Sequence, residues 1–352
     1  MLFLIFLLSC TLASASKNIE QEIAYYESII SQHPGNAHAH LQVAQLYLTK
    51  GKFIEGWQEL EWHLGYKPEF TRNAQKYFQT HQSLQGKIIL LTAEWGAGDT
   101  IWLTRYAQLL KTRGAHVIIH VMHNSLIPLF KQQPYFDEIL PRESTNIPCH
   151  FEIPMMSLPM VFNTTVENIP ADIPYIQIYQ KLVDMWKEKL NSDKNFKIGI
   201  CWHGNTIHGE EKFMPLSYFA QLASARHSSS NDDGHIPNIS IYSLQQHHGL
   251  DQLDKLENEG VIKTFDADFD SIPFLDTAAV IKNLDLVITV DTSIAHLAGA
   301  LGVPVWVILP TSADWRWMLD RDDSPWYPTM KLFRQHSGWQ KVIDEIKSAL
   351  KN

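Results

Sequence analysis

The chain has 352 residues, of which 45% are hydrophobic and 19% charged, and these proportions are typical of a globular protein. Its 29 Lys and Arg against 38 Asp and Glu give a net charge of −9, which excludes a protein that binds nucleic acid through a basic surface. Three cysteines exclude a disulfide-stapled scaffold. At about 150 residues per domain, the length predicts two domains with an appendage.

Residues 1–16 form an apolar leader. A continuous apolar run over residues 1–8, followed by small residues up to Ala15, is typical of a secretory signal that is cleaved there. No basic residue precedes Lys17, however, and such signals usually begin with one. The sequence around Cys10 also resembles a bacterial lipoprotein site. An uncleaved apolar helix packed on the protein remains the alternative to export.

Residues 17–80 have a helical pattern. Pro34 and Pro68 are separated by the tetratricopeptide period of 34 residues, and small residues at Ala44 and Gly56 favour a close approach of two helices. The segment holds about one and a half repeats, and about three are needed for a free solenoid. We therefore expect these helices to dock on the following domain, with a partner-binding module as the alternative reading.

From residue 85 onward, strands and helices alternate, which predicts two Rossmann-like halves with parallel sheets at residues 85–190 and 195–335. A C-terminal helix is expected within residues 337–352. The expected strands are residues 87–92, 116–121, 138–140, 150–153, 175–178, 197–202, 240–244, 261–265, 286–290 and 303–309. The main expected helices are residues 99–113, 126–132, 181–190, 216–225 and 338–350.

A glycine turn follows the first strand and opens the first helix. Gly96 and Gly98 let the backbone approach a ligand, and the turn lacks the spacing of a dinucleotide fingerprint or a P-loop. Asp99 lies in the first helical turn, where a carboxylate can accept a proton from a hydroxyl nucleophile. The alternative is that Asp99 only caps the helix.

A second polar cluster follows the strand at residues 286–290. Asp291, Thr292 and Ser293 begin a helix rich in small residues, and hydroxyls with free N–H groups at a helix start suit a diphosphate. His296 lies on the first turns of that helix, within reach of a phosphate oxygen or a sugar hydroxyl. Capping and packing are the structural alternatives for the same residues.

Five further residues, in three segments, complete the candidate site. Lys212 lies in a polar loop and is a point charge that can pair with a phosphate. Gln245 follows a strand, where its amide can read a ribose hydroxyl. Asp314, Trp315 and Arg316 follow a strand at the ligand-bearing edge of a sheet, with a packed aromatic latch as the alternative. No metal-ligand spacing is present, so neither a metal nor a cofactor is expected.

Several motifs, in this order, resemble one bacterial enzyme family. The chain is similar to glycosyltransferase family 9, the ADP-heptose:lipopolysaccharide heptosyltransferase superfamily, in its tetratricopeptide-linked branch. The motifs that carry the resemblance are residues 55–62, 98–100, 291–298, 302–306, 314–317, 320–328 and 333–335.

The resemblance implies an α/β GT-B fold, in which the first Rossmann-like domain takes the acceptor and the second takes the nucleotide-sugar. It implies an inverting reaction in which Asp99 is the general base. Residues 291–293 would hold the donor diphosphate with His296 nearby, and Lys212 would offset the leaving-group charge where other enzymes use a metal.

The sequence departs from the family at two donor positions. Ser293 replaces the glycine of the heptosyltransferases proper, and Lys212 replaces the usual arginine of the linked branch, so the donor is not assumed to be ADP-heptose. The expected partners are a nucleotide-sugar donor, a glycan, lipid or protein acceptor, and a protein that binds the N-terminal helices. Cytoplasmic location, at the inner face of the membrane, is expected from the donor, against export through the leader. A non-catalytic GT-B-like binding protein and a nucleotide-sugar hydrolase or epimerase are the alternative functions.

Overall fold

The computed structural model describes residues 19–65, 82–205, 213–224, 238–266, 268–269 and 271–351. The apolar leader and Lys212 lie outside the described residues. In the described part, no helix is both long and apolar enough to cross a bilayer.

Three helices form the N-terminal appendage: α1 (Ile19–Gln32), α2 (Ala37–Thr49) and α3 (Phe53–Leu60), followed by the 3-10 helix η1 (Glu61–Leu64). Asn36 caps α2, because its side chain accepts a hydrogen bond from the Ala39 N–H at 3.1 Å. A Cβ on Gly56 would lie 2.6 Å from the Leu48 side chain, so the glycine permits the close helix pair that the repeat pattern predicts.

The appendage docks on the body of the protein through α3. Trp57 is 1% exposed, and its Nε1 donates to the Thr164 carbonyl at 2.8 Å. The Trp57 ring also lies edge-on to Trp315, with ring centres 5.4 Å apart, and to Trp326 at 6.4 Å. The helices therefore share a hydrophobic core with both halves of the protein, as expected for so few repeats.

The first half contains a parallel sheet of order β3-β2-β1-β4. Its strands are β1 (Ile88–Thr92), β2 (His116–His120), β3 (Glu138–Leu140) and β4 (Phe151–Pro154). Its helical segments are α4 (Ala97–Leu103), α5 (Arg105–Thr112), η4 (Asn124–Leu126), α6 (Ile127–Phe130), η5 (Met155–Ser157) and α7 (Leu158–Val161).

Two expectations for this half are wrong in detail. The single helix expected over residues 99–113 is divided at Thr104 into α4 and α5. The strand expected over residues 175–178 does not form, because the N–H groups of Tyr175 and Ile176 both donate to the Ala300 carbonyl, at 3.0 and 3.2 Å. This segment therefore joins the first half to a helix end of the second half.

The second half contains a parallel sheet of order β6-β5-β7-β8-β9. Its strands are β5 (Phe196–Cys201), β6 (Ile239–Ser243), β7 (Leu286–Val290), β8 (Val305–Leu309) and β9 (Met330–Arg334). Its helical segments are α8 (Gln180–Leu190), α9 (Leu216–Ser224), η9 (Leu250–Gln252), α10 (Leu253–Asn258), α11 (Leu275–Ile281), α12 (Ser293–Ala300), η10 (Trp315–Trp317) and α13 (Trp339–Ala349).

The strand expected over residues 261–265 is reduced to one bridge between Lys263 and Tyr242. The side chain of Lys263 forms an ion pair with Asp193, with Nζ 2.6 Å from the carboxylate. Strand β9 was not expected; it extends the sheet beside β8.

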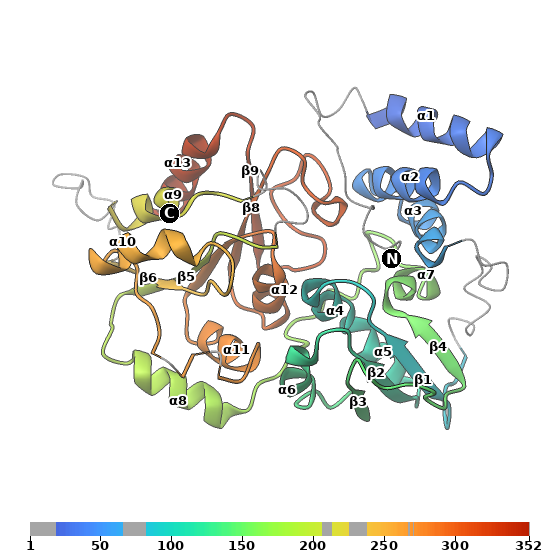
Figure 1. Cartoon of the computed structure of the whole chain (residues 1–352), viewed down its shortest axis with the longest axis horizontal. Coiled ribbons are helices and arrows are strands. Elements are labelled where there is room, and N and C mark those ends of the chain that lie inside the picture. Colours follow the sequence, from blue (N-terminus) through green and yellow to red (C-terminus); the bar gives the residue numbers. More distant parts are fainter. Residues whose placement is uncertain are drawn as a thin grey trace.

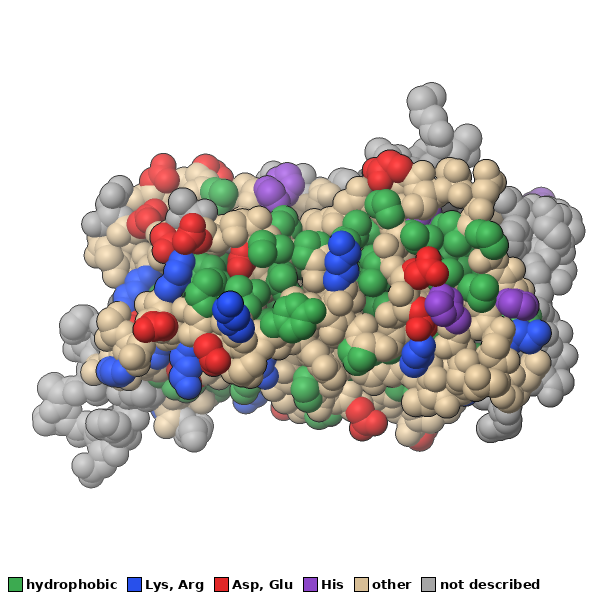
Figure 2. All heavy atoms as spheres, turned by 90° about the horizontal axis from the view of Figure 1, so that it is seen from below, with side chains coloured by type: hydrophobic (Ala, Val, Ile, Leu, Met, Phe, Trp, Pro, Cys, Tyr) green, Lys and Arg blue, Asp and Glu red, His purple; other side chains and the backbone are tan. Residues whose placement is uncertain are grey.

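Helices α4 and α12 lie side by side between the two sheets (Figure 1). Each follows the carboxyl end of a parallel strand, β1 or β7, which is where ligands bind in such sheets. On the face shown in Figure 2, basic and acidic side chains are interspersed rather than gathered into a basic patch.

Candidate active site

The Asp99 carboxylate is held at the start of α4. Its Oδ2 accepts a hydrogen bond from the Gly96 N–H at 3.0 Å, and Thr100 Oγ1 donates to the Gly96 carbonyl at 3.1 Å. The capping interaction that the sequence offers as an alternative is therefore present. Only Oδ2 takes part in this cap, and the other carboxylate oxygen, Oδ1, has a different partner.

Asp99 Oδ1 pairs with Nη2 of Arg316, a residue of the second half. Nη1 of the same guanidinium donates to Asp314 at 2.8 Å. The Arg316 side chain is 7% exposed, whereas Asp99 and Asp314 are 24% and 27% exposed. Burial by itself lowers the pKa of Arg316, but the two carboxylates outweigh it and raise the pKa, so the guanidinium stays charged.

Tryptophan rings enclose the Arg316 guanidinium. Its central carbon lies 4.3 Å from the ring centre of Trp315, 4.7 Å from that of Trp102 and 5.9 Å from that of Trp95. Trp315 is 4% exposed and packs on Trp102 and Trp57, so its ring faces are taken up by the protein. In this structure the segment is therefore a packed aromatic cluster rather than an exposed aromatic surface.

The first turn of α12 meets α4 directly. Thr292 is the N-cap, and its Oγ1 accepts a hydrogen bond from the Ile294 N–H at 3.3 Å. A Cβ on Gly98 would lie 3.2 Å from the Ser293 Cα and 3.0 Å from His296 Cδ2. Only a glycine allows this contact between the halves without displacing a neighbour. Asp291, just before α12, is half-buried, and its charge helps to raise the pKa of Arg316.

His296 is a neutral buried imidazole. It is 5% exposed, stacks on Trp317 with ring centres 5.5 Å apart, and its Nδ1 lies 3.0 Å from the Tyr327 hydroxyl. Burial, followed by the charges of Arg316 and Arg105, lowers the pKa of His296 to about 3. The ring therefore carries one proton at neutral pH.

Gln245 has a different surrounding from the one expected. Its Oε1 accepts hydrogen bonds from the N–H groups of Trp202 and His203, at 3.0 and 2.9 Å, and its Nε2 donates to the His203 carbonyl at 2.9 Å. The amide is 5% exposed and holds the turn after β5. Its contacts are with the backbone of this turn and with the Cys201 thiol, which lies 3.4 Å from Oε1.

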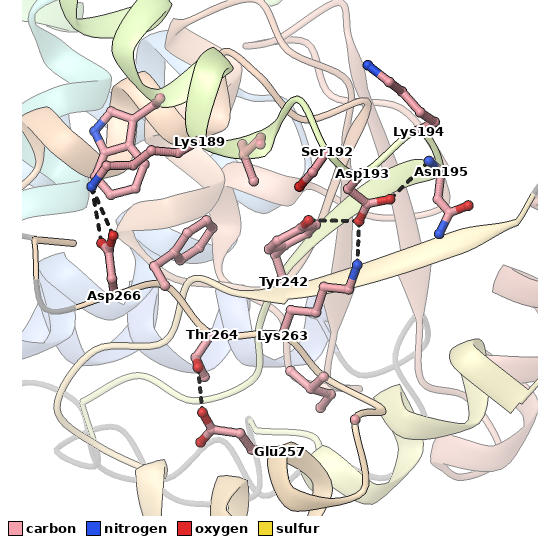
Figure 3. Close-up of a pocket in the computed structure, with 15 residues that line it drawn as sticks. Lys189, Ser192, Asp193, Lys194, Asn195, Tyr242, Glu257, Lys263, Thr264 and Asp266 are labelled. Carbon is pink, nitrogen blue, oxygen red and sulfur yellow. Dashed lines mark hydrogen bonds and ion pairs between the residues drawn. The ribbon is translucent and has the colours of Figure 1, made fainter.

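A cavity of about 800 Å³ lies elsewhere in the second half and contains none of the expected site residues. Figure 3 shows that its charged groups face one another: Lys263 pairs with Asp193 at 2.6 Å, and Lys189 pairs with Asp266 at 3.0 Å. Across the described ranges, no group of three or more His, Cys, Asp or Glu side chains is arranged to hold a metal ion.

The structure thus brings together Gly96, Gly98 and Asp99 from the first half with residues 291–293, His296 and residues 314–316 from the second. Sequence reasoning missed the pairing of Asp99 with Arg316, because 217 residues separate them. The signal available was the acidic-aromatic-basic run after β8, which places a cation at the same sheet edge as α12.

Comparison with known proteins identifies similar sequences and folds. Residues 160–308 match the model of glycosyltransferase family 9 (heptosyltransferase). Protein FlbA of Caulobacter vibrioides is 22% identical over 345 residues, a match that covers 88% of this chain and 54% of that protein. The chain therefore spans about half the length of this curated relative.

Two solved structures have a similar fold. The glycosyl transferase family 9 protein of Veillonella parvula has a TM-score of 0.55 and 14% identity, over 78% of this chain and 92% of that one. The E. coli ADP-heptose LPS heptosyltransferase II has a TM-score of 0.52 and 13% identity, over 74% of this chain and 98% of that one. The expected resemblance is confirmed: the chain has the GT-B fold of these enzymes, and residues 160–308 are similar to glycosyltransferase family 9.

Proposed function

We propose that the chain is an inverting glycosyltransferase, which moves a sugar from a nucleotide-diphosphate-sugar to an acceptor hydroxyl. One observation carries the proposal: Asp99 and the first turn of α12 come from different halves and meet at Gly98. A hydroxyl-activating carboxylate and a diphosphate-binding helix start must be this close to act on one anomeric carbon.

The donor diphosphate would lie at the start of α12. The positive end of a helix dipole favours an anion, and the hydroxyls of Thr292 and Ser293 lie at that end of α12. Arg316 lies beside them, but its charge is already balanced by Asp99 and Asp314, so the helix start and Lys212 are the groups we propose for the diphosphate. We propose that the ammonium group of Lys212 also pairs with the diphosphate. These groups would carry the leaving-group charge, so we expect turnover without a divalent metal.

Asp99 would act as the general base. Its carboxylate takes the proton of the acceptor hydroxyl as the new bond to the anomeric carbon forms. The bond from that carbon to the diphosphate breaks on the opposite face, the nucleoside diphosphate leaves with the electron pair, and the configuration is inverted. The ion pair with Arg316 favours the ionised form of Asp99 that a base requires.

A non-catalytic GT-B-like binding protein is the second candidate. It is favoured by the fact that both Asp99 oxygens already have partners in the protein, Gly96 and Arg316. In that case the exposed face of the N-terminal helices would recruit a protein partner, since the Trp57 face is buried against the body.

The acceptor class we propose is a hydroxyl of a glycan, a lipid-linked saccharide or a protein. Because nucleotide-sugars are made in the cytoplasm, we place the activity there, at the inner face of the membrane. A donor of the ADP-heptose type, as named for the E. coli relative, is one member of the donor class to be tested.

A thermal-shift screen tests the proposal. The full chain is incubated with ADP-heptose, ADP-glucose, UDP-glucose, GDP-mannose and CDP-glucose, with and without EDTA. We expect a shift with one nucleotide class that persists in EDTA and is reduced in Lys212→Ala. No shift with any of the five would favour the binding protein, and a shift lost in EDTA would contradict metal independence.

A further inference from the structure

A chain of hydrogen bonds joins the first half of the protein to His296. Arg105 Nη2 donates to the Tyr175 hydroxyl at 3.2 Å, that hydroxyl lies 3.2 Å from the Tyr327 hydroxyl, and the Tyr327 hydroxyl lies 3.0 Å from His296 Nδ1. The four residues are between 0% and 5% exposed, so the chain is closed to water.

Arg105 fixes one end of this chain. Its Nε donates to the Trp102 carbonyl at 2.8 Å, and its Nη1 donates to the Trp326 carbonyl at 2.8 Å. The guanidinium also stacks on the Tyr175 and Tyr327 rings, at 4.9 and 4.6 Å from their centres. With its other donors engaged by carbonyls, Nη2 is held toward the Tyr175 hydroxyl.

The chemistry of arginine sets the direction of the chain. A guanidinium only donates, so the Tyr175 hydroxyl accepts from Arg105 and has its single hydrogen left to donate. The acceptor at hydrogen-bond distance is the Tyr327 hydroxyl, which in turn directs its own hydrogen to His296 Nδ1. The opposite direction would leave the buried Tyr175 hydrogen without an acceptor among the described residues, which is unfavourable inside a protein.

His296 Nδ1 is therefore an acceptor, and the one proton of the neutral ring lies on Nε2. That nitrogen is bonded to Cδ2, which faces Gly98 at the junction of α4 and α12. Within the described residues, Nε2 has no hydrogen-bond partner in the protein. The N–H donor is thus one bond away from an atom that lies where the two halves meet.

We propose that Arg105, Tyr175 and Tyr327 are positioning residues, which keep His296 in its Nε2–H form so that it donates a hydrogen bond to an oxygen of the bound nucleotide-sugar. The tautomer follows from the contacts of the protein alone. The ligand oxygen rests on the proposed function.

The tautomer is tested by NMR of protein labelled with ¹⁵N in histidine, with the His296 signals identified by their loss in His296→Gln. We expect a protonated Nε2 and a bare Nδ1 in the full chain, and a mixture of tautomers in Tyr327→Phe. Tyr106→Phe is the matched control, because it removes an equally buried hydroxyl that bonds Thr164 at 2.8 Å outside the chain. A protonated Nδ1 in the wild type, or an unchanged signal in Tyr327→Phe, would overturn the proposal.

The role toward the ligand is tested by a double-mutant comparison of donor affinity with the same five nucleotide-sugars. Tyr327→Phe should weaken binding by about twofold, because the apparent affinity falls with the fraction of His296 that keeps the Nε2–H form, about half in an equal mixture of tautomers. In the His296→Gln background, Tyr327→Phe should cost little more, because a glutamine amide carries an N–H whatever its neighbours. An equal loss in both backgrounds would show a purely structural role. If none of the five binds, the proposed function fails, while the NMR result still decides the tautomer.

Discussion

The pH dependence of stability gives a quantitative test of the buried, neutral His296. Its pKa of about 3 in the folded protein lies below the usual value of 6.5, so the unfolded chain binds this proton first as the pH falls. Stability from this residue is fully present above pH 6.5 and is lost progressively as the pH falls toward 3. Between pH 7 and pH 5 the loss is about 2 kcal/mol, because each pH unit in that interval is worth about 1.4 kcal/mol once the unfolded histidine is protonated.

Urea denaturation of the wild type and of His296→Gln at pH 7 and pH 5 measures this contribution. The other histidines are present in both proteins, so their contributions cancel in the comparison. Among them is His63. Burial opposes its protonation, but the ion pair with Glu94 dominates and raises its pKa. Unlike His296, His63 therefore stabilises the folded protein more as the pH falls. We expect the wild type to lose about 2 kcal/mol more than the variant over this interval. Equal losses would refute a neutral His296 and the hydrogen-bond direction that requires it.

Two substitutions at the junction of the halves have predicted costs. Arg316→Met should lower the free energy of unfolding by about 2–3 kcal/mol. This is less than the cost of breaking a fully buried pair, because the Asp99 carboxylate still reaches water. The control Arg321→Met breaks a surface pair and should cost under about 1 kcal/mol. Equal effects in urea denaturation would argue against the buried pair. Gly98→Ala should cost about 1–2 kcal/mol, since overpacking against the backbone of α12 outweighs the helix preference of alanine, and it should weaken donor binding. Gly35→Ala, which meets nothing within 4 Å, is its control, and a Gly98→Ala protein as stable as this control would contradict the close contact.

Sequence reasoning succeeded where the signal is local. Apolar runs such as β7 predict buried parallel strands. The polar turns at Gly96 and Thr292 each follow the carboxyl end of such a strand, which is the edge of the sheet where ligands bind. The docking of the N-terminal helices followed from their small number of repeats. These features depend on residues close together in the chain, so a single sequence contains them.

The features that were missed depend on contacts between distant segments. The pairing of Arg316 with Asp99 depends on how the two sheets face each other, and no local pattern encodes that. Gln245 is predicted to read a ribose hydroxyl from its place after a strand, and this stays a prediction. The bonds of its amide to the backbone of the turn after β5 could not be predicted from that place. The extended segment at Tyr175 is predicted to be a strand because it is apolar, but its backbone N–H groups donate to the carbonyl at the end of α12.

Turnover by Asp99→Asn tests the central claim most directly. With the donor identified by the screen, release of the nucleoside diphosphate is measured in the wild type, in Asp99→Asn and in Asp172→Asn, which alters an exposed carboxylate of the same half. We predict a loss of about 100- to 10,000-fold in Asp99→Asn with nucleotide affinity nearly unchanged, and no loss in the control. Full turnover in Asp99→Asn would contradict its role as the general base.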